Sequence, residues 1–196
     1  ASIAMLKKEG YGVEALKEKG RTLVFEDTQK DIRYFLVKPN DCITYVQHGV
    51  ADIGIVGKDT LMEGSDDYYE LLDLNIGKCR FILGGLKGHN PFDKLGHITI
   101  GTKYPNVAKA YFMEKGREIE CIKIDGSVEL APLLGLCDGI VDIMETGDTL
   151  RENGLVVFDT LCELSARVIV NKASLKLKQT AVCAVLEDLQ RGSEAC

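Results

Sequence analysis

Short apolar runs alternate with amphipathic segments along almost the whole chain, and this alternation is the feature that most limits the possible folds. Runs rich in Val and Ile, such as 51–57, 98–102 and 139–144, are bounded by Gly, Asp or Pro, which is typical of buried strands. Amphipathic segments such as 39–49 and 106–116 lie between them and end at glycines. The pattern predicts an α/β protein whose sheets are largely parallel.

The other segments are assigned in the same way. Further strands are predicted at 2–6, 21–26, 32–39, 79–85, 119–125, 155–161 and 166–172. Further helices are predicted at 12–20, 127–136, 148–154 and 174–192, and Asn40 is expected to cap the helix that starts at residue 39. Segment 66–74 is either a short helix or an extended link. Segment 85–97, with its Gly, Pro and Asn residues, is expected to be a linker or a surface loop.

The overall composition argues against several classes of function. The 196 residues carry a net charge of −6 with a pI near 5.2, so neither nucleic acid nor an anionic membrane is expected as a partner. No apolar run approaches the roughly 20 residues of a membrane-spanning helix. Seven cysteines, an odd number without a Cys-x-x-Cys pair, predict reduced thiols in a cytoplasmic protein rather than a zinc site or a disulfide framework.

One short phrase occurs twice, once in each half of the chain. The stretch "ADIGIVGKDTL", from Ala51 to Leu61, is echoed by "VDIMETGDTL", from Val141 to Leu150. In both, an apolar strand leads into a turn with Gly, Asp and Thr, and ligands of open α/β sheets bind at the carboxyl ends of strands. Two such ends, one from each of two lobes, would form two walls of a cleft. Chance or simple packing is the alternative explanation of so short an echo.

Only the second copy carries the residues of an anion site. Two acids precede a turn that offers a glycine and two threonines: Asp142, Glu145, Thr146, Gly147, Asp148 and Thr149. The glycine lets backbone N–H groups approach a ligand, and the threonine hydroxyls add further donors. Acids beside a phosphate cradle suit a ligand that also presents sugar hydroxyls or Mg²⁺, which is the general pattern of phosphoribosyl diphosphate (PRPP) sites. A capped turn with solvated acids is the alternative.

A longer stretch around this motif resembles the signature of a known family. The run "DGSVELAPLLGLCDGIVDIMETGDTL", from Asp125 to Leu150, is similar to that of short-form ATP phosphoribosyltransferases, and the likeness extends over nearly the whole chain from Gly20 onward. It implies attack of N1 of the ATP adenine on C1′ of PRPP, with Mg²⁺ and release of diphosphate, as the first step of histidine biosynthesis. A two-lobed solute-binding protein without turnover, or another PRPP-dependent phosphoribosyltransferase, are the alternatives.

The resemblance also implies a fold. Members of this family have a two-lobed type II periplasmic-binding-protein-like fold, in which the chain crosses twice between the lobes. Residues 1–85 and 162–196 would then form lobe I. Residues 86–161 would form lobe II, which carries the PRPP-binding loop.

Site residues are implied residue by residue. The loop that binds the ribose and 5′-phosphate of PRPP would consist of Asp142, Glu145, Thr146, Gly147, Asp148 and Thr149, with Glu129 facing the same site. Arg21 matches an arginine that stabilises the departing diphosphate, so Arg21 and Asp142 are the expected catalytic residues. No metal ligand is assigned, since Mg²⁺ would be bound mainly through the diphosphate. The family's Lys-Gly-Arg-like loop after the first strand has no match here, and part of the ATP site stays unassigned.

Partners are implied as well. Short-form members form homodimers, and they bind a separate regulatory subunit similar to histidyl-tRNA synthetase. After residue 172 one helical segment is expected, which leaves less than the roughly 50 residues of a further domain. Histidine is therefore expected to inhibit this enzyme only through that partner, in a hetero-oligomer.

Overall fold

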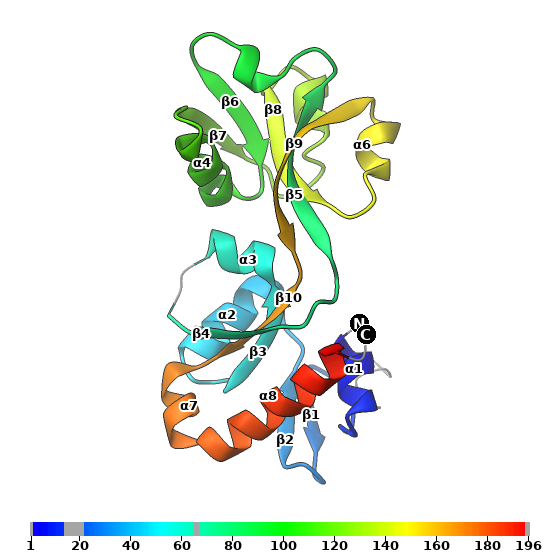
Figure 1. Cartoon of the computed structure of the whole chain (residues 1–196), viewed down its shortest axis with the longest axis vertical. Coiled ribbons are helices and arrows are strands. Elements are labelled where there is room, and N and C mark those ends of the chain that lie inside the picture. Colours follow the sequence, from blue (N-terminus) through cyan, green and yellow to red (C-terminus); the bar gives the residue numbers. More distant parts are fainter. Residues whose placement is uncertain (1, 14–21, 65–66, 195–196) are drawn as a thin grey trace. The chain divides into compact units, whose positions relative to one another are not determined.

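Figure 1 shows the computed structural model of the chain, which describes residues 2–13, 22–64 and 67–194. The protein consists of two compact units. Unit 1 comprises residues 1–77 and 165–196, and unit 2 is the continuous stretch 78–164. Unit 2 is thus an insertion in the sequence of unit 1, and each unit has a sheet and helices of its own.

Unit 2 is built on a five-stranded sheet with the strand order β7-β6-β8-β5-β9. The strands are β5 (Cys79–Leu86), β6 (Ile98–Thr102), β7 (Ile119–Lys123), β8 (Gly139–Met144) and β9 (Leu155–Leu164). Its helices are α4 (Pro105–Glu114), α5 (Leu130–Leu133) and α6 (Asp148–Glu152), with one 3₁₀ turn, η2 (Pro91–Asp93). Residues Phe81, Leu83, Ile100 and Phe112 are fully buried, so the main core of the unit lies between the sheet and α4.

Unit 1 contains a hairpin and a separate three-stranded sheet. The hairpin consists of β1 (Val24–Asp27) and β2 (Ile32–Phe35), and the sheet has the order β3-β10-β4, with β3 (Ile53–Gly57), β10 (Ala166–Val170) and β4 (Tyr69–Asp73). The helices are α1 (Ser2–Lys8), α2 (Pro39–Gln47), α3 (Lys58–Glu63), α7 (Lys172–Leu177) and α8 (Gln179–Glu194). β10 comes from the last part of the chain and completes the sheet as its central strand.

The prediction of largely parallel sheets is wrong for the described strands. Only the pairings of β6 with β7 and with β8 are parallel, and every other described pairing is antiparallel. Parallel neighbours need a crossover connection, which the segments with α4 and α5 supply. The short turn between β1 and β2 forces an antiparallel hairpin. β5 and β9, which carry the chain into and out of unit 2, pair antiparallel with each other.

The segment 85–97 is more ordered than the surface loop expected from its composition. Asn90 caps η2, because its side chain accepts a hydrogen bond from the backbone N–H of Phe92 at 3.1 Å. The Phe92 ring then stacks on Phe112, with 4.9 Å between ring centroids. An aromatic residue in a Pro- and Gly-rich segment therefore fixes this connection to the core of unit 2.

Other segments differ from their predicted state because tertiary packing decides short apolar runs. Residues 2–6 belong to α1 rather than to a strand, and Met5 packs in a core cluster with residues of α8. Residues 66–74 contain β4, the extended alternative. The helix expected at 127–136 is only the four-residue α5, and the closing helix is divided at Lys178 into α7 and α8. Of the helix predicted at 12–20, residues 14–20 lie outside the described residues.

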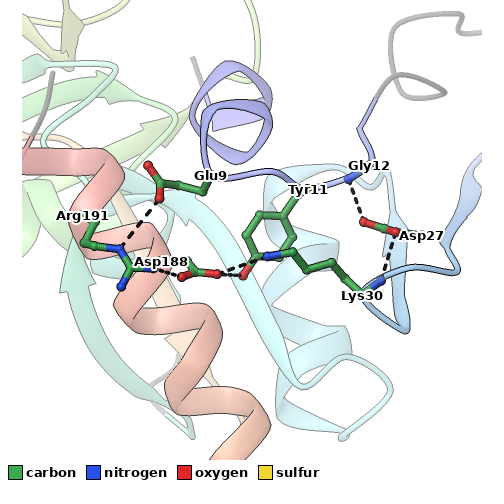
Figure 2. A network of polar contacts seen from close by, with 7 residues as sticks. All are labelled: Glu9, Tyr11, Gly12, Asp27, Lys30, Asp188 and Arg191. Atoms are coloured by element: carbon green, nitrogen blue, oxygen red, sulfur yellow. Dashed lines mark hydrogen bonds and ion pairs between the residues drawn. The ribbon is translucent and has the colours of Figure 1, made fainter.

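A polar network joins α1, the hairpin and α8 within unit 1 (Figure 2). The Tyr11 hydroxyl donates to Asp188 at 2.8 Å, and Lys30 lies 3.5 Å from the same carboxylate and over the Tyr11 ring. Asp27 accepts from the Gly12 backbone N–H at 2.7 Å, and this hydrogen bond holds the pKa of Asp27 below its usual range. Tyr11 and Asp188 are 177 positions apart in the sequence, so these contacts connect the first and last elements of unit 1.

We expect the buried Asn171 to be a strong local determinant of stability. Its side-chain oxygen accepts from the backbone N–H groups of Ala173 and Ser174, both at 2.9 Å, and caps α7. Its amide nitrogen donates to the Val46 carbonyl at 2.7 Å, which ties α7 to the end of α2. Asn171→Ala removes a cap and leaves a buried carbonyl without its donor, so the free energy of unfolding should fall by about 2–3 kcal/mol in urea titrations.

Asn40 provides the matched control. The sequence predicted it as the cap of α2, but the cap is Lys38, Pro39 occupies the first turn, and no side chain caps this end. The Asn40 side chain is exposed, so Asn40→Ala should change the free energy of unfolding by less than about 0.5 kcal/mol. Equal losses in both variants would contradict the role assigned to Asn171.

Candidate functional site

A small cavity lies in unit 2 where β8 ends and the chain turns into α6. Its volume is about 220 Å³, and it is lined by Ile82, Glu129, Asp142, Ile143, Met144, Glu145, Thr146, Gly147, Thr149 and Leu150. Six of the residues that the sequence assigned to one site, Glu129, Asp142, Glu145, Thr146, Gly147 and Thr149, are therefore brought together here. Asp148 lies in the same turn outside the lining. Arg21 lies outside the described residues.

Asp142 occupies the floor of this cavity. It stands opposite Ile82 in the antiparallel register of β8 with β5, so both side chains project from the same face of the sheet. Burial raises the pKa of the Asp142 carboxyl above its usual range, and the negative charge of Glu129 raises it further. The Ile143 backbone N–H, at 2.8 Å, opposes this shift. A half-buried carboxylate that accepts one neighbouring N–H has lone pairs left for a ligand.

The turn after β8 depends on Gly147. Its φ is +84°, a conformation that favours glycine, and a β-carbon there would lie 3.0 Å from the Met144 sulfur. Thr146 Oγ1 donates to the Asp148 carboxylate at 2.7 Å, and Arg151 also pairs with that carboxylate. The backbone N–H groups of Thr146, Gly147 and Thr149 find no acceptor among the described residues. The turn that lines the cavity therefore contains backbone donors and the Thr149 hydroxyl.

Lys103 is a candidate site residue that sequence reasoning missed. It follows β6 directly, and its charge lowers the pKa of Asp142, opposing the effect of burial. β6 and β8 are parallel neighbours, so their carboxyl ends lie at one edge of the sheet. Thr102 strengthens this junction, since its hydroxyl donates to the Val141 carbonyl at 2.6 Å. The position of Lys103 immediately after a predicted strand was the signal that could have identified it.

The two copies of the repeated phrase have different surroundings. In the first, Lys178 lies 2.9 Å from both carboxylate oxygens of Asp52, and the Ser174 hydroxyl donates to it at 2.6 Å. Burial opposes the Asp52 charge, but these partners hold its pKa below the usual range. Asp52 thus stabilises unit 1, whereas Asp142 is held in a cavity without an ion pair to a described cation. The Asp52 carboxylate of the first copy therefore has a structural role, and the second copy provides the candidate site described here.

Other kinds of site find less support in the described parts of the chain. No three His, Cys, Asp or Glu side chains there are grouped as a metal site would need. The described cysteines, at 42, 79, 121, 137, 162 and 183, form no disulfide with one another. Within the same residues, no helix is long and apolar enough to cross a membrane.

Comparison with known proteins identifies the family of the chain. The HisG family profile, described as ATP phosphoribosyltransferase, matches residues 38–191. A curated protein named ATP phosphoribosyltransferase from Clostridium acetobutylicum is 50% identical over 190 residues, which cover 97% of this chain and 88% of that protein. A protein of the same name from Clostridium botulinum is 52% identical over 190 residues, covering 96% of this chain and 90% of the relative. The chain belongs to the ATP phosphoribosyltransferase family.

A solved structure supports the same family at the level of the fold. The chain is similar to one in the ATP phosphoribosyl transferase (HisG:HisZ) complex from Thermotoga maritima, with a TM-score of 0.83 and 38% identity over 100% of this chain and 93% of that chain. The fold is therefore the mixed α/β fold of an ATP phosphoribosyltransferase. Membership makes the protein a glycosyltransferase of the first step of histidine biosynthesis.

Proposed function

We propose that this protein joins N1 of the ATP adenine to C1′ of PRPP with release of diphosphate, and that the cavity at the end of β8 holds PRPP. The observation that carries the assignment is the convergence of six candidate residues from two separate parts of the sequence on one cavity. One wall offers hydrogen-bond donors and the floor offers carboxylates. A sugar phosphate presents the matching groups at its two ends, an anion and vicinal hydroxyls.

The 5′-phosphate is proposed to bind in the turn from Thr146 to Thr149. Backbone N–H groups that have no described acceptor, together with the Thr149 hydroxyl, can donate to phosphate oxygens. The cation of Lys103 at the neighbouring strand end adds electrostatic attraction for the phosphate. Asp148, which is held by Thr146 and Arg151, fixes the shape of the turn rather than facing the ligand.

The ribose is proposed to lie over Asp142 and Glu129. Ionised carboxylates accept hydrogen bonds from sugar hydroxyls, and such charge-assisted bonds are stronger than neutral ones. Their negative charge also suits the positive character that develops at C1′ as diphosphate departs. Asp142 thereby positions the ring for attack by the adenine nitrogen. Arg21 is proposed to neutralise the diphosphate, on the basis of its match to the family arginine.

Mg²⁺ fits this chemistry. Hard divalent cations prefer oxygen ligands, which the diphosphate of PRPP supplies, and no three carboxylates of the described residues are grouped to bind the ion by themselves. The ion is proposed to be held mainly by the diphosphate of PRPP, where its charge assists the leaving group.

The two units are proposed to be the lobes of a type II periplasmic-binding-protein-like fold, close to the expected limits of 1–85 with 162–196 and 86–161. The insertion of unit 2 within unit 1 supports this, because the chain must then pass between them twice.

A turnover assay distinguishes this function from its alternatives. The chain is mixed with PRPP, Mg²⁺ and ATP, and diphosphate release is followed. Release that requires ATP supports the proposal. Release with a free base instead of ATP would indicate another phosphoribosyltransferase, and tight PRPP binding without release would indicate a binding protein.

Replacement of Lys103 should weaken PRPP binding and alter its pH dependence. Lys103→Met removes an exposed cation, so PRPP affinity measured by calorimetry should fall roughly fivefold, with a smaller effect at high salt. Without this charge, the pKa of Asp142 should rise further, and the acid limb of the activity profile should move to higher pH. Lys109→Met, an exposed change on α4, is the control, and an equal loss there would refute the specific role of Lys103.

The partner proposal rests on the family. The Thermotoga maritima structure is titled a HisG:HisZ complex, which supports a hetero-oligomer. We propose that this chain forms homodimers and binds a regulatory subunit similar to histidyl-tRNA synthetase. Histidine should then leave the activity of the isolated chain unchanged at concentrations that inhibit the complex. Saturable inhibition of the isolated chain in a histidine titration would contradict this regulation.

A further inference from the structure

A second and larger cavity lies within unit 1. Its volume is about 1120 Å³, just above the roughly 300–1,000 Å³ of small-molecule sites. It is bounded by α1, the hairpin, α2, β3 and α8, all of which belong to unit 1. We call it the strand-edge cavity, because the residues that line it follow the edges of two strands.

The lining pattern reveals the geometry of this cavity. Side chains of a strand alternate between its two faces, so a pocket on one face is lined by every second residue. Here every residue from 31 to 37, which includes β2, and every residue from 51 to 57, which includes β3, contributes to the lining. The strand-edge cavity therefore runs along the edges of β2 and β3 and touches both faces of each strand.

Those two edges carry backbone hydrogen-bonding groups. β3 is at one end of the order β3-β10-β4, and β2 pairs with β1 in a separate hairpin. Among the described strands, no partner lies on the other edge of either. Exposed strand edges are templates for pairing with a further strand, which supplies N–H and C=O groups on both of its sides.

The walls determine the chemistry of an occupant. Cys42 and Tyr45 of α2 line one side, and Val182, Val185 and Leu189 of α8 line the other. These helices cover opposite faces of β3, since Gly54 faces Cys42 and Val46 while Ile53 and Ile55 pack in the cluster of α8. A strand that lies between two apolar layers has an unbroken apolar run rather than alternating polar residues.

A buried hydroxyl provides independent evidence for a ligand with a polypeptide backbone. Tyr34 lines the cavity, and its hydroxyl is buried with no hydrogen-bond partner in the described residues. Burial raises the pKa of Tyr34 to about 12, with a contribution from the Asp27 charge, so the group is a neutral O–H donor. A buried donor without an acceptor is costly, and a backbone carbonyl of an inserted strand would satisfy it.

From these observations we propose that the strand-edge cavity is a binding site for an extended polypeptide segment with a continuous apolar run, which pairs with β2 and β3 and joins the hairpin to the three-stranded sheet. The proposed segment comes from outside the 196 residues. It is similar to the residues that the relatives have beyond the region matched by this chain. This chain covers 88% of the Clostridium acetobutylicum protein and 93% of the solved Thermotoga maritima chain, so both have residues available for one strand.

Peptide binding tests the proposal directly. Overlapping synthetic peptides that tile the unmatched residues of the Clostridium acetobutylicum relative are titrated into the full chain. A peptide with an unbroken apolar run should bind saturably, raise the unfolding temperature, and slow hydrogen exchange at 32–37 and 53–57 by at least about tenfold. A copy of that peptide with alternate backbone nitrogens methylated cannot form the ladder and should not bind.

Variants of the chain make the test specific. Val185→Trp places a larger side chain in the cavity and should abolish binding, whereas Leu177→Trp, at a position that is 83% exposed on α7, should leave it unchanged. Failure of every peptide to bind the folded chain would overturn the proposal, as would equal binding of the methylated copy. Self-association that protects the same strands without any peptide would also overturn it, in favour of a second copy as the occupant.

Discussion

Asp142→Asn should reduce turnover strongly while leaving the protein at least as stable as before. The substitution keeps the shape of the side chain but removes the charge proposed to orient the ribose hydroxyls. Loss of charge-assisted hydrogen bonds worth about 1.5–3 kcal/mol corresponds to a roughly 10- to 150-fold lower kcat/KM. Steady-state kinetics with PRPP and ATP measures this effect.

The stability of this variant follows from the sign of the pKa shift. Burial and Glu129 raise the pKa of Asp142, so the folded state holds the proton more tightly than the unfolded state does. The protonated Asp142 carboxyl therefore favours folding at pH values below its pKa in the unfolded chain. This contribution to stability is lost as the pH rises through its pKa in the folded protein. At neutral pH the charge is a cost, and Asn removes it. A variant that unfolds more readily but keeps normal turnover would show that Asp142 is structural.

Asp159 in the same unit gives the opposite control. A hydrogen bond from the Tyr111 hydroxyl, aided by the charge of Lys115, holds the pKa of Asp159 below its usual range. Its stabilising contribution is present above the unfolded pKa and is lost as the pH falls through the folded pKa. Asp159→Asn should therefore lower stability at neutral pH and leave PRPP binding unchanged. The two substitutions together separate loss of function from loss of fold.

Gly147→Val should nearly abolish PRPP binding. A β-branched residue at a φ of +84° is strained by about 1–2 kcal/mol, and its β-carbon would press on the Met144 sulfur at 3.0 Å. The turn must shift to relieve this, which moves the backbone donors away from the phosphate. We expect a loss of about 100-fold or more in PRPP affinity by calorimetry, equivalent to at least two donors.

Gly154→Val separates backbone strain from the site. Gly154 has a φ of +69°, but a β-carbon there meets nothing within 4 Å, and the residue does not line the cavity. This variant should lose stability without losing affinity. Thr149→Ala, which removes one hydroxyl without strain, should cost about 1.5–3 kcal/mol of PRPP binding. Unchanged affinity in both Gly147→Val and Thr149→Ala would remove the turn from the site.

Elements that are determined by neighbouring residues were predicted correctly, and elements that depend on distant parts of the chain were not. The hairpin β1–β2 and the strands β3 and β8 are encoded by short apolar runs next to clear turns, so they were predictable. The direction of β5 and β9 was not, because it depends on the chain entering and leaving unit 2. α1 was assigned as a strand because five apolar and small residues cannot indicate whether they face a sheet or a helix.

The same reasoning applies to the candidate site. The turn from Asp142 to Thr149 is continuous in sequence, so one motif contains most of the cavity. Glu129 was found through the longer family signature, because it lies at the start of α5, outside the motif of the turn. Lys103 directly follows a predicted strand, but its effect on Asp142 depends on the parallel pairing of β6 with β8, which the sequence alone did not specify. The buried Tyr34 hydroxyl, similarly, depends on packing across unit 1.

The order of the strands in unit 1 has a consequence for synthesis on the ribosome. Its sheet has β10 at the centre, and β10 is translated only after all of unit 2. β3 and β4 therefore emerge early without the strand that joins them. Unit 2, whose first and last residues approach through the pairing of Cys79 with Leu164, can complete its core before that strand appears. The inserted unit is thus positioned to fold first, and the unit that begins the chain is the last to close.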